Sequence, residues 1–164
     1  MNISGMILRK PTKEDGHSVH LLITQTPELD SNSCYCNLLQ CSHFSDTSII
    51  AEKQGKILGF ISGYLKPENP TTIFIWQVCV SLDARGKGIA SQMLQQLLGR
   101  KGCASITHLE TTIAATNKAS WALFNRLGEH FHAPLERSVM FDRTTHFNDD
   151  HDSELLARIG PLAR

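Results

Sequence analysis

The spacing of apolar residues along the chain is typical of strands in some segments and of amphipathic helices in others. Residues 72–80 are apolar at nearly every position, which predicts a strand buried on both faces. Residues 88–99 carry apolar side chains three and four positions apart, at 89, 90, 93, 94, 97 and 98, and these form one stripe on a helix. The chain therefore passes from a buried strand through a short segment, 81–87, directly into an amphipathic helix.

The same patterns predict elements on either side. Thr12 is a predicted helix N-cap with Asp15 in the first turn, and Pro27 stops that helix near Gln25. Gln54-Gly55 separates two apolar runs and predicts a hairpin. Strands are predicted at 7–10, 48–52, 57–65, 106–113, 139–141 and 155–159, with further helices near 35–41 and from Asn117 to a C-cap at Gly128. Residues 144–154 are predicted to be a polar loop, and the order predicts a mixed α/β sheet.

Length and charge narrow the class of protein. A chain of 164 residues is expected to form one domain, 1–164, with a core that needs neither metal nor disulfide. Sixteen basic and sixteen acidic side chains balance, which gives no electrostatic reason to expect nucleic acid or an anionic membrane as partner. We find no signal peptide and no apolar run of membrane-spanning length, and expect the five cysteines to be reduced thiols in the cytoplasm.

The segment between the buried strand and its helix has the composition of an anion site. Gly86 and Gly88 permit positive φ and close approach of a ligand to the backbone. The free N–H groups at a helix start, together with the helix dipole, favour negative charge there, and Arg85 and Lys87 add cations. A Walker P-loop and a dinucleotide fingerprint both require other glycine spacings. The remaining pattern, Arg85-x-x-Gly88-x-Ala90, resembles the coenzyme A pyrophosphate loop of the GNAT acetyltransferase superfamily.

A closer resemblance covers roughly residues 7–160 and points to the L-2,4-diaminobutyric acid acetyltransferases of ectoine synthesis. The segments that carry it are 29–41, 59–64, 76–78, 109–113, 117–124 and His151-Asp152. The resemblance implies the GNAT fold, an α/β (α+β) mixed sheet that is mostly antiparallel, with splayed middle strands and flanking helices. It also implies acetyl transfer from acetyl-CoA to the γ-amine of L-2,4-diaminobutyrate without a metal, by a cytoplasmic homodimer.

Direct transfer needs a proton acceptor, a polarised carbonyl and a held thioester. Glu110, in the middle of the strand at 106–113, is the candidate acceptor, directly or through water; an exposed strand residue without a role is the alternative. Backbone N–H groups at Val78–Val80 are expected to polarise the carbonyl and to pair with the pantetheine amides. The expected acetyl-CoA contacts are Val78, Cys79, Val80, Arg85, Gly86, Lys87, Gly88, Ile89, Ala90, Asn117, Ser120 and Phe124.

The acceptor amino acid needs its own contacts, and the resemblance places them in the irregular segment before the hairpin. Asp30 is expected to pair with an ammonium, and Tyr35 and Asn37 to hydrogen-bond to the substrate. The remaining expected contacts are an apolar wall, Trp76, and two residues that close the pocket, Thr111 and His151. A helix cap, core aromatics and a solvated loop histidine are the structural alternatives for these residues.

Several competing interpretations remain open at this stage. Many GNAT enzymes carry a Tyr that protonates the leaving thiolate, but here that position is Phe124, so the acid is another residue, water or none. Cys79 as a nucleophile and Cys34-x-Cys36-x4-Cys41-x-His43 as a zinc site are both disfavoured: Cys79 has no adjacent His, and the second pattern lacks a Cys-x2-Cys knuckle. The alternatives for function are acetylation of another primary amine and a non-catalytic acyl-CoA-binding regulator.

Overall fold

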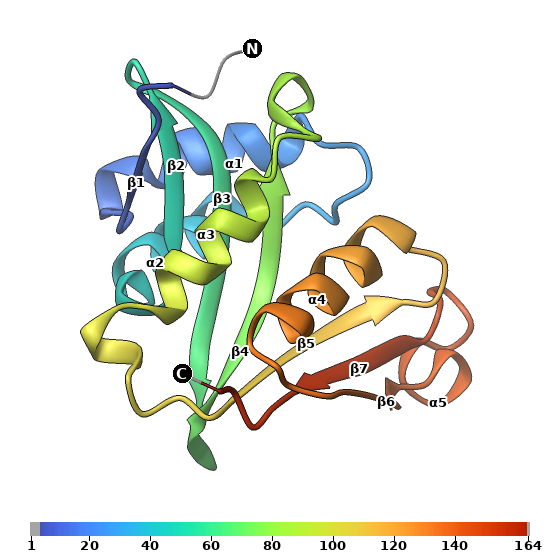
Figure 1. Ribbon diagram of the computed structural model, residues 1–164. Helices are drawn as coiled ribbons and strands as arrows, with labels where there is room; N and C mark the ends of the chain where they lie inside the picture. Colours follow the sequence, from blue (N-terminus) through green and yellow to red (C-terminus); the bar gives the residue numbers. More distant parts are fainter. Residues whose placement is uncertain (1–3, 164) are drawn as a thin grey trace. The chain divides into compact units, whose positions relative to one another are not determined.

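Seven strands and five α-helices make up the computed structural model, which describes residues 4–163 (Figure 1). The strands are β1 Ile7–Arg9, β2 Ile49–Lys53, β3 Lys56–Lys66, β4 Asn69–Val80, β5 His108–Ala114, β6 Leu135–Phe141 and β7 Glu154–Ile159. The helices are α1 Gly16–Thr24, α2 Cys34–Ser42, α3 Ile89–Leu98, α4 Lys118–His130 and α5 Arg143–Phe147. The strand order is β1-β2-β3-β4-β5-β7-β6, which is the mixed α/β sheet predicted from the sequence.

The chain forms two compact units, and β4 runs through both. Unit 1 comprises residues 1–64 and 75–104, and unit 2 comprises 65–74 and 105–164. Each unit therefore contains strands from separate parts of the sequence, and each carries a different share of the predicted site residues. The expectation of a single domain over 1–164 stays a prediction.

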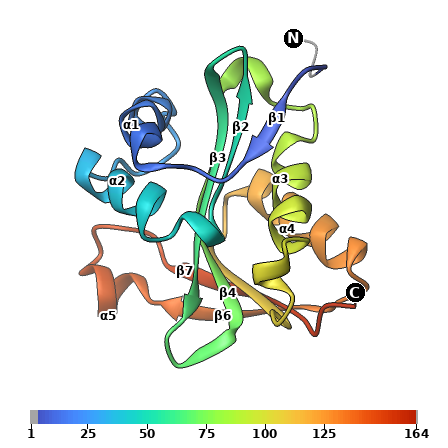
Figure 2. The same ribbon diagram turned by 90° about the vertical axis from the view of Figure 1, so that its left-hand side faces the viewer.

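Unit 1 is built on antiparallel pairs of β1 with β2 and of β2 with β3. Helices α1 and α2 cover one face of these strands and α3 covers the other (Figures 1 and 2). Alternate strand positions and the apolar stripe of α1 meet in one cluster, because each would otherwise expose apolar surface to water. Its fully or almost fully buried members are Val19, Leu22, Ile23, Cys41, Ile50, Phe60 and Cys79.

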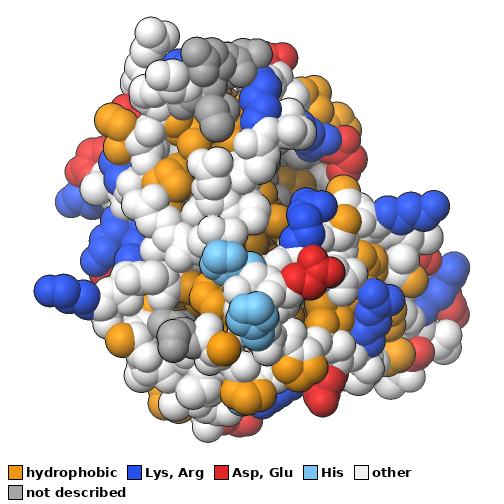
Figure 3. Space-filling view, in the orientation of Figure 1, with side chains coloured by type: hydrophobic (Ala, Val, Ile, Leu, Met, Phe, Trp, Pro, Cys, Tyr) orange, Lys and Arg blue, Asp and Glu red, His pale blue; other side chains and the backbone are white. Residues whose placement is uncertain are grey.

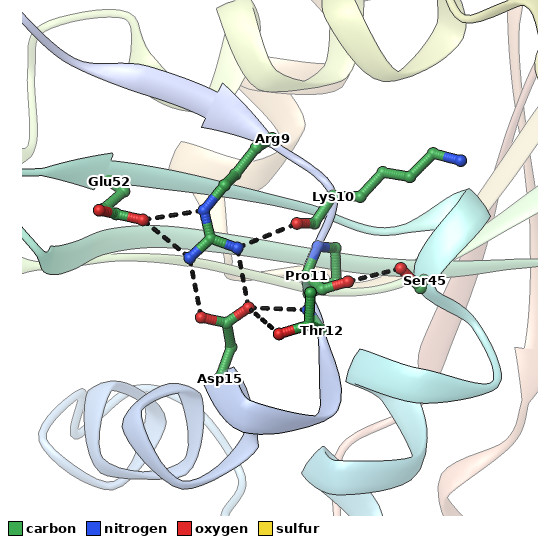
Figure 4. A network of polar contacts seen from close by, with 7 residues as sticks. All are labelled: Arg9, Lys10, Pro11, Thr12, Asp15, Ser45 and Glu52. Atoms are coloured by element: carbon green, nitrogen blue, oxygen red, sulfur yellow. Dashed lines mark hydrogen bonds and ion pairs between the residues drawn. The ribbon is translucent and has the colours of Figure 1, made fainter.

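A polar network joins the first strand to the first helix of unit 1 (Figure 4). The Arg9 guanidinium donates two hydrogen bonds to the Asp15 carboxylate, both 2.8 Å, and its Nε donates to Glu52 at 2.8 Å. The backbone N–H of Thr12 donates to Asp15 Oδ2 at 2.7 Å, so the helix start predicted at Thr12 and Asp15 is confirmed. Ser45 donates to the carbonyl of Pro11 at 2.5 Å and ties down the entry to the helix.

Unit 2 is built on β7, which pairs antiparallel with β5 on one side and β6 on the other. Helix α4 lies along one face of these strands (Figure 1). The side chains that face it alternate along the strands, and Leu109, Ile113, Ala157 and Ile159 are at most 3% exposed. Trp121 on α4 donates its indole N–H to the carbonyl of Ala114 at 3.1 Å, which fixes the helix against the end of β5.

Gly128 is not the helix C-cap that the sequence predicts, because α4 continues to His130. A Cβ on Gly128 would lie 3.0 Å from the carbonyl oxygen of Ala133, so the glycine is required for close approach of the returning chain. The backbone N–H of Ala133 donates to the carbonyl of Gly128 at 2.9 Å. His132, with φ 47°, supplies the left-handed conformation that reverses the chain.

The predicted polar loop at 144–154 is also wrong in part, because it contains most of α5. Asp142 caps this short helix: its Oδ1 accepts hydrogen bonds from the N–H groups of Thr144 and Thr145 at 3.1 and 2.8 Å. His146 Nδ1 accepts the N–H of Asp142 at 2.8 Å and closes the turn. Strand β6 begins at Leu135, four positions before the predicted start, because pairing with β7 extends it over polar residues.

The surface agrees with the balanced composition. Acidic and basic side chains are interspersed on the face shown in Figure 3, with hydrophobic side chains between them. Among residues 4–163, no helix has both the length and the hydropathy needed to cross a bilayer.

Candidate active site

The glycine loop of unit 1 has the backbone that its sequence predicts. Gly86 and Gly88 have φ of +73° and +74°, and no heavy atom lies within 4 Å of where a Cβ would stand on either residue. Gly88 is the N-cap of α3, so the first N–H groups of that helix open at the loop. The loop therefore combines open space, positive φ and a helix start, which is the geometry that holds a phosphate group.

The two cations of this loop already have partners within unit 1. Arg85 pairs with Glu28 through two contacts of 3.1 Å, and its Nε donates to the carbonyl of Val80 at 3.2 Å. Lys87 Nζ donates to the carbonyl of Asp83 at 2.9 Å. Glu28 was not among the residues expected from sequence, and it counters the charge that Arg85 would offer to an anion.

Cys79, on the strand before the loop, does not have the accessible thiol that a nucleophile needs. Cys79 is 1% exposed, and burial raises the pKa of its thiol. Its Sγ lies 3.3 Å from the Thr26 hydroxyl and 3.9 Å from the carbonyl oxygen of Leu22. The Cys79 side chain is thus part of the core of unit 1, and only its backbone remains a candidate contact, with that of the half-buried Val78 and Val80.

Three of the residues expected to bind the acceptor are accessible on unit 1. Asp30 is exposed in the segment between α1 and α2, and Tyr35, on α2, is 69% exposed. Trp76 on β4 is 44% exposed although its strand was predicted to be buried on both faces. Tyr64 holds Trp76 edge to face, with ring centroids 6.3 Å apart, so that the indole keeps its orientation while open to solvent.

Asn37 is placed differently from its expected role in substrate binding. It is fully buried, its Oδ1 lies 2.9 Å from His20 Nδ1, and its Nδ2 donates to Gln40 Oε1 at 2.9 Å. The contact with His20 joins α2 to α1, and the one with Gln40 lies within α2. The amide therefore positions the helix that carries Tyr35 rather than pointing to solvent.

Unit 1 also contains a groove of about 510 Å³ between α1, the β2–β3 turn and residues 81–83. None of the residues expected to bind acetyl-CoA or the acceptor lines it.

Glu110 lies on β5 in unit 2, and its side chain is 2% exposed. Its Oε2 accepts a hydrogen bond from Lys66 Nζ at 2.6 Å, and its Oε1 accepts one from Arg158 Nη1 at 2.5 Å. Burial by itself raises the pKa of this carboxyl group, but the hydrogen bonds and charges of the two cations outweigh it and lower the pKa below its ordinary value. Sequence reasoning missed both cations, which lie 44 and 48 positions from Glu110.

The other expected residues of unit 2 lie in the middle of β5, at the start of α4 and in the middle of α4. Thr111 follows Glu110 and is 5% exposed. Asn117 caps α4, with its Oδ1 accepting the N–H of Ser120 at 3.1 Å. Phe124 is 2% exposed within the core of this unit, so the position that carries a Tyr in many relatives contributes packing here. The arrangement leaves the exposed Asn117 and the half-buried Ser120 at the start of α4 as the accessible part of this set.

His151 belongs to an aromatic cluster at the edge of unit 2. Its ring centroid lies 4.6 Å from that of Phe147, and Phe147 contacts Phe141 at 6.3 Å. A bulge in β6 between Val139 and Phe141 pairs Phe141 with Glu154 and so turns it to the sheet face that carries Glu110. His151 Nδ1 donates to the carbonyl of Asp152 at 2.6 Å, which in the neutral ring leaves Nε2 as an acceptor.

Across the described residues, 4–163, no group of three or more His, Cys, Asp or Glu side chains is arranged to hold a metal ion. Cys34, Cys36 and Cys41 are free thiols on α2, and burial raises the pKa of Cys41 to about 12.

Known proteins resemble the chain along almost its whole length. Residues 17–128 match the acetyltransferase (GNAT) family. The L-2,4-diaminobutyric acid acetyltransferase of Methylotuvimicrobium alcaliphilum is 49% identical over 94% of this chain and 90% of its own, and that of Vibrio cholerae is 51% identical over 93% and 88%. The diaminobutyrate acetyltransferase EctA of Paenibacillus lautus, solved with L-2,4-diaminobutyric acid and coenzyme A, is similar with a TM-score of 0.90 and 40% identity, over 95% of each chain.

The fold of the sheet, the glycine loop at the start of α3 and these similarities agree with one another. The chain belongs to the acetyltransferase (GNAT) family and, within it, to the L-2,4-diaminobutyric acid acetyltransferases.

Proposed function

We propose that this protein transfers the acetyl group of acetyl-CoA to the γ-amine of L-2,4-diaminobutyrate and yields N4-acetyl-L-2,4-diaminobutyrate for ectoine synthesis. The observation that carries the proposal is the similarity over 95% of the chain to an enzyme solved with diaminobutyric acid and coenzyme A. The geometry of unit 1 supports it, because the loop at Gly86 and Gly88 is open to a pyrophosphate. The proposed location is the cytoplasm, where acetyl-CoA is available.

The proposed reaction is direct attack in a ternary complex. The amine nitrogen attacks the thioester carbon, the C–S bond breaks, and coenzyme A leaves as a thiolate. Cys79 forms no acetyl intermediate, because it is buried and the pKa of its thiol is raised. Phe124 has no proton to give, and a thiol pKa of about 8.5 is low enough for departure without an acid.

Two groups of the chain are assigned to the reacting centre. Backbone N–H groups at Val78–Val80 polarise the thioester carbonyl, since such donors need no reorganisation. Glu110 receives the amine proton, through water, and passes it to solvent. Its low pKa keeps it ionised, and the protons that it relays to solvent are the one that the γ-ammonium loses before attack and the one that the nitrogen loses once the new C–N bond has made it acidic.

Recognition of the amino acid is assigned to the accessible residues described above. Asp30 pairs with an ammonium group, Tyr35 donates a hydrogen bond, and Trp76 forms an apolar wall. The substrate contacts expected of Thr111 and His151, which belong to unit 2, stay a prediction. Asn37 acts on the substrate only by positioning α2, because its amide is bonded to His20 and Gln40.

An acceptor screen tests this proposal. Purified protein and acetyl-CoA are incubated with diaminobutyrate, ornithine, lysine and spermidine, and free thiol is followed. Diaminobutyrate is expected to be the best acceptor, with ornithine about 10- to 200-fold poorer in kcat/KM, since one methylene discriminates by about 1–3 kcal/mol. NMR of the product should show acetylation at the γ-nitrogen. Mainly α-acetylation, or a preference for ornithine, would overturn the assignment, and no turnover with any amine would favour a regulator that only binds acyl-CoA.

We also propose that the protein is a homodimer that pairs through β6. This strand ends the sheet order, and six of its seven residues are exposed, including Val139 at 59%, Met140 at 37% and Phe141 at 38%. An exposed apolar edge strand is a template for pairing with another chain. Light scattering should give twice the chain mass for the wild type and the chain mass for Val139→Lys. A wild-type monomer, or a Val139→Lys dimer, would remove β6 as the interface.

A further inference from the structure

The carboxylate of Glu110 is held at both oxygens by cations from two other strands. Cross-strand pairing of β5 with β7 sets Arg158 directly opposite Glu110, and the last residue of β3, Lys66, reaches the other oxygen. The two contacts are 2.5 and 2.6 Å and join cationic donors to an ionised acceptor, so both are charge-assisted hydrogen bonds. Each oxygen therefore has a fixed direction, and the carboxylate plane cannot rotate without breaking one contact.

The exposures of Glu110, Lys66 and Arg158 show which of the three charges depends on the other two for compensation. Glu110 is 2% exposed, whereas Lys66 and Arg158 are 33% and 36% exposed. The cations would be solvated without their partner, but the carboxylate would be a buried charge without compensation. An uncompensated buried carboxylate takes up a proton at neutral pH instead of remaining charged.

We infer that Lys66 and Arg158 are positioning residues for catalysis: they hold Glu110 ionised and aimed so that it can accept the proton of the attacking amine. This inference rests on the proposed function of Glu110 as proton acceptor. Neither cation is assigned a contact with substrate. Their contribution passes through the carboxylate alone, and it is greatest where Glu110 would otherwise be protonated.

Other charged groups on the same sheet face do not replace these cations. His108 lies two residues before Glu110 on β5, and Glu136 on β6 is the cross-strand partner of Arg158. Acidic residues predominate among the rest, with Glu154 on β7 and Glu68 in the β3–β4 turn. Residues 69–74 of β4 carry no charge. Among these groups, the downward displacement of the Glu110 pKa comes from Lys66 and Arg158, and added carboxylates would oppose it.

The test compares Arg158→Met, Arg158→Lys and Lys66→Met with the wild type. The pH dependence of kcat/KM for diaminobutyrate is measured with saturating acetyl-CoA. Removal of either cation should shift the acidic limb of this pH profile to higher pH by at least about one unit. The reason is that a neighbouring opposite charge lowers a carboxyl pKa by about 1–3 units. Activity should recover at high pH, and Arg158→Lys should restore most of the wild-type profile. Arg126→Met, which removes an exposed cation on α4, is the matched control and should leave the limb in place.

A second measurement does not depend on turnover. Carboxyl ¹³C NMR, with the Glu110 resonance assigned by its loss in Glu110→Gln, follows the ionisation of this group directly. Its midpoint should rise in Arg158→Met and in Lys66→Met, which lies at a strand end and serves if the first variant does not fold. If the midpoint rises but diaminobutyrate is not acetylated by the wild type, the proposed function fails while the electrostatic role stands.

Three results would overturn the inference. One is an unchanged NMR midpoint in Lys66→Met. Another is a pH profile whose acidic limb stays in place in both Met variants, while only kcat or the stability of the protein decreases. The third is a role in binding: if the Met variants lose only their preference for diaminobutyrate over 1,3-diaminopropane, which lacks the carboxylate, the cations bind the substrate directly.

Discussion

Arg85 and Glu28 are joined by two parallel contacts of 3.1 Å although 57 positions separate them in the chain. The pair lies at the loop proposed to hold the pyrophosphate of acetyl-CoA. Glu28 is 61% exposed and Arg85 41%, so the contact can exchange for a contact with an anion at little cost. Glu28 thus competes with the phosphates for the guanidinium.

Replacement of Glu28 by Gln should strengthen acetyl-CoA binding. The KM for acetyl-CoA is expected to fall about two- to fivefold at low ionic strength, the range of an exposed ion pair, and the difference should fade with salt. Steady-state kinetics at two salt concentrations measure it, with Glu14→Gln, an exposed acid of the first turn, as control. An unchanged KM at low salt would mean that Arg85 does not reach the phosphates.

Gly88→Asp should raise the KM for acetyl-CoA at least tenfold. The substitution sets a side chain and a negative charge in the open space above the loop, at φ +74°. Gly55→Asp is the matched control, because Gly55 also has a positive φ, +76°, and open space but lies in the β2–β3 turn. The control introduces the same backbone strain at a position that is not proposed to contact the pyrophosphate. Equal KM values in the two variants, both folded, would exclude the loop from the binding site.

Glu110→Ala should lower kcat by about 10²-fold or more at neutral pH and leave the KM for acetyl-CoA nearly unchanged, because a lost proton acceptor affects chemistry rather than cofactor binding. Partial recovery is expected at high pH, where solution supplies free amine. Stopped-flow and steady-state measurements between neutral and alkaline pH test this. Normal turnover at neutral pH would show that Glu110 is not the acceptor.

Asp30→Asn should weaken the binding of diaminobutyrate far more than the binding of acetyl-CoA. The substitution keeps the shape and hydrogen-bonding capacity of an exposed side chain but removes the charge that faces an ammonium. A rise of about tenfold in the KM for diaminobutyrate is expected. Asp83→Asn, another exposed acid of unit 1, is the control. Equal effects on the KM of both substrates would argue against an ammonium contact at Asp30.

Asp15→Asn should lower the free energy of unfolding at pH 7 by about 2 kcal/mol, since the amide offers Arg9 one acceptor oxygen in place of two and no negative charge. Hydrogen bonding to Arg9 is the main cause that lowers the pKa of Asp15 in the folded protein. Its stabilisation is therefore complete above the unfolded pKa, about 4, and is lost as pH falls through the lower folded value. Urea unfolding of wild type and variant between pH 7 and 3 should show the difference narrow below pH 4. A constant difference would contradict this origin.

The sequence alone was sufficient where neighbouring residues determine the outcome. The strand, glycine loop and amphipathic helix around Gly88 follow from local periodicity and from the freedom of glycine at positive φ, and the helix start at Thr12 follows from its capping pattern. The exposed positions of Asp30 and Tyr35 also agree with the polar, irregular segment that precedes the hairpin.

Only the tertiary structure decided the contacts that depend on strand order and packing. Register between β5 and β7 brings Arg158 to Glu110, and packing of α2 on α1 buries Asn37. The end of α4 depends on the returning chain at Ala133, which no helical pattern contains. Local periodicity cannot specify such pairs, because strand pairing and helix packing join positions tens of residues apart, and the charge state of a buried carboxylate depends on which cations they bring to it.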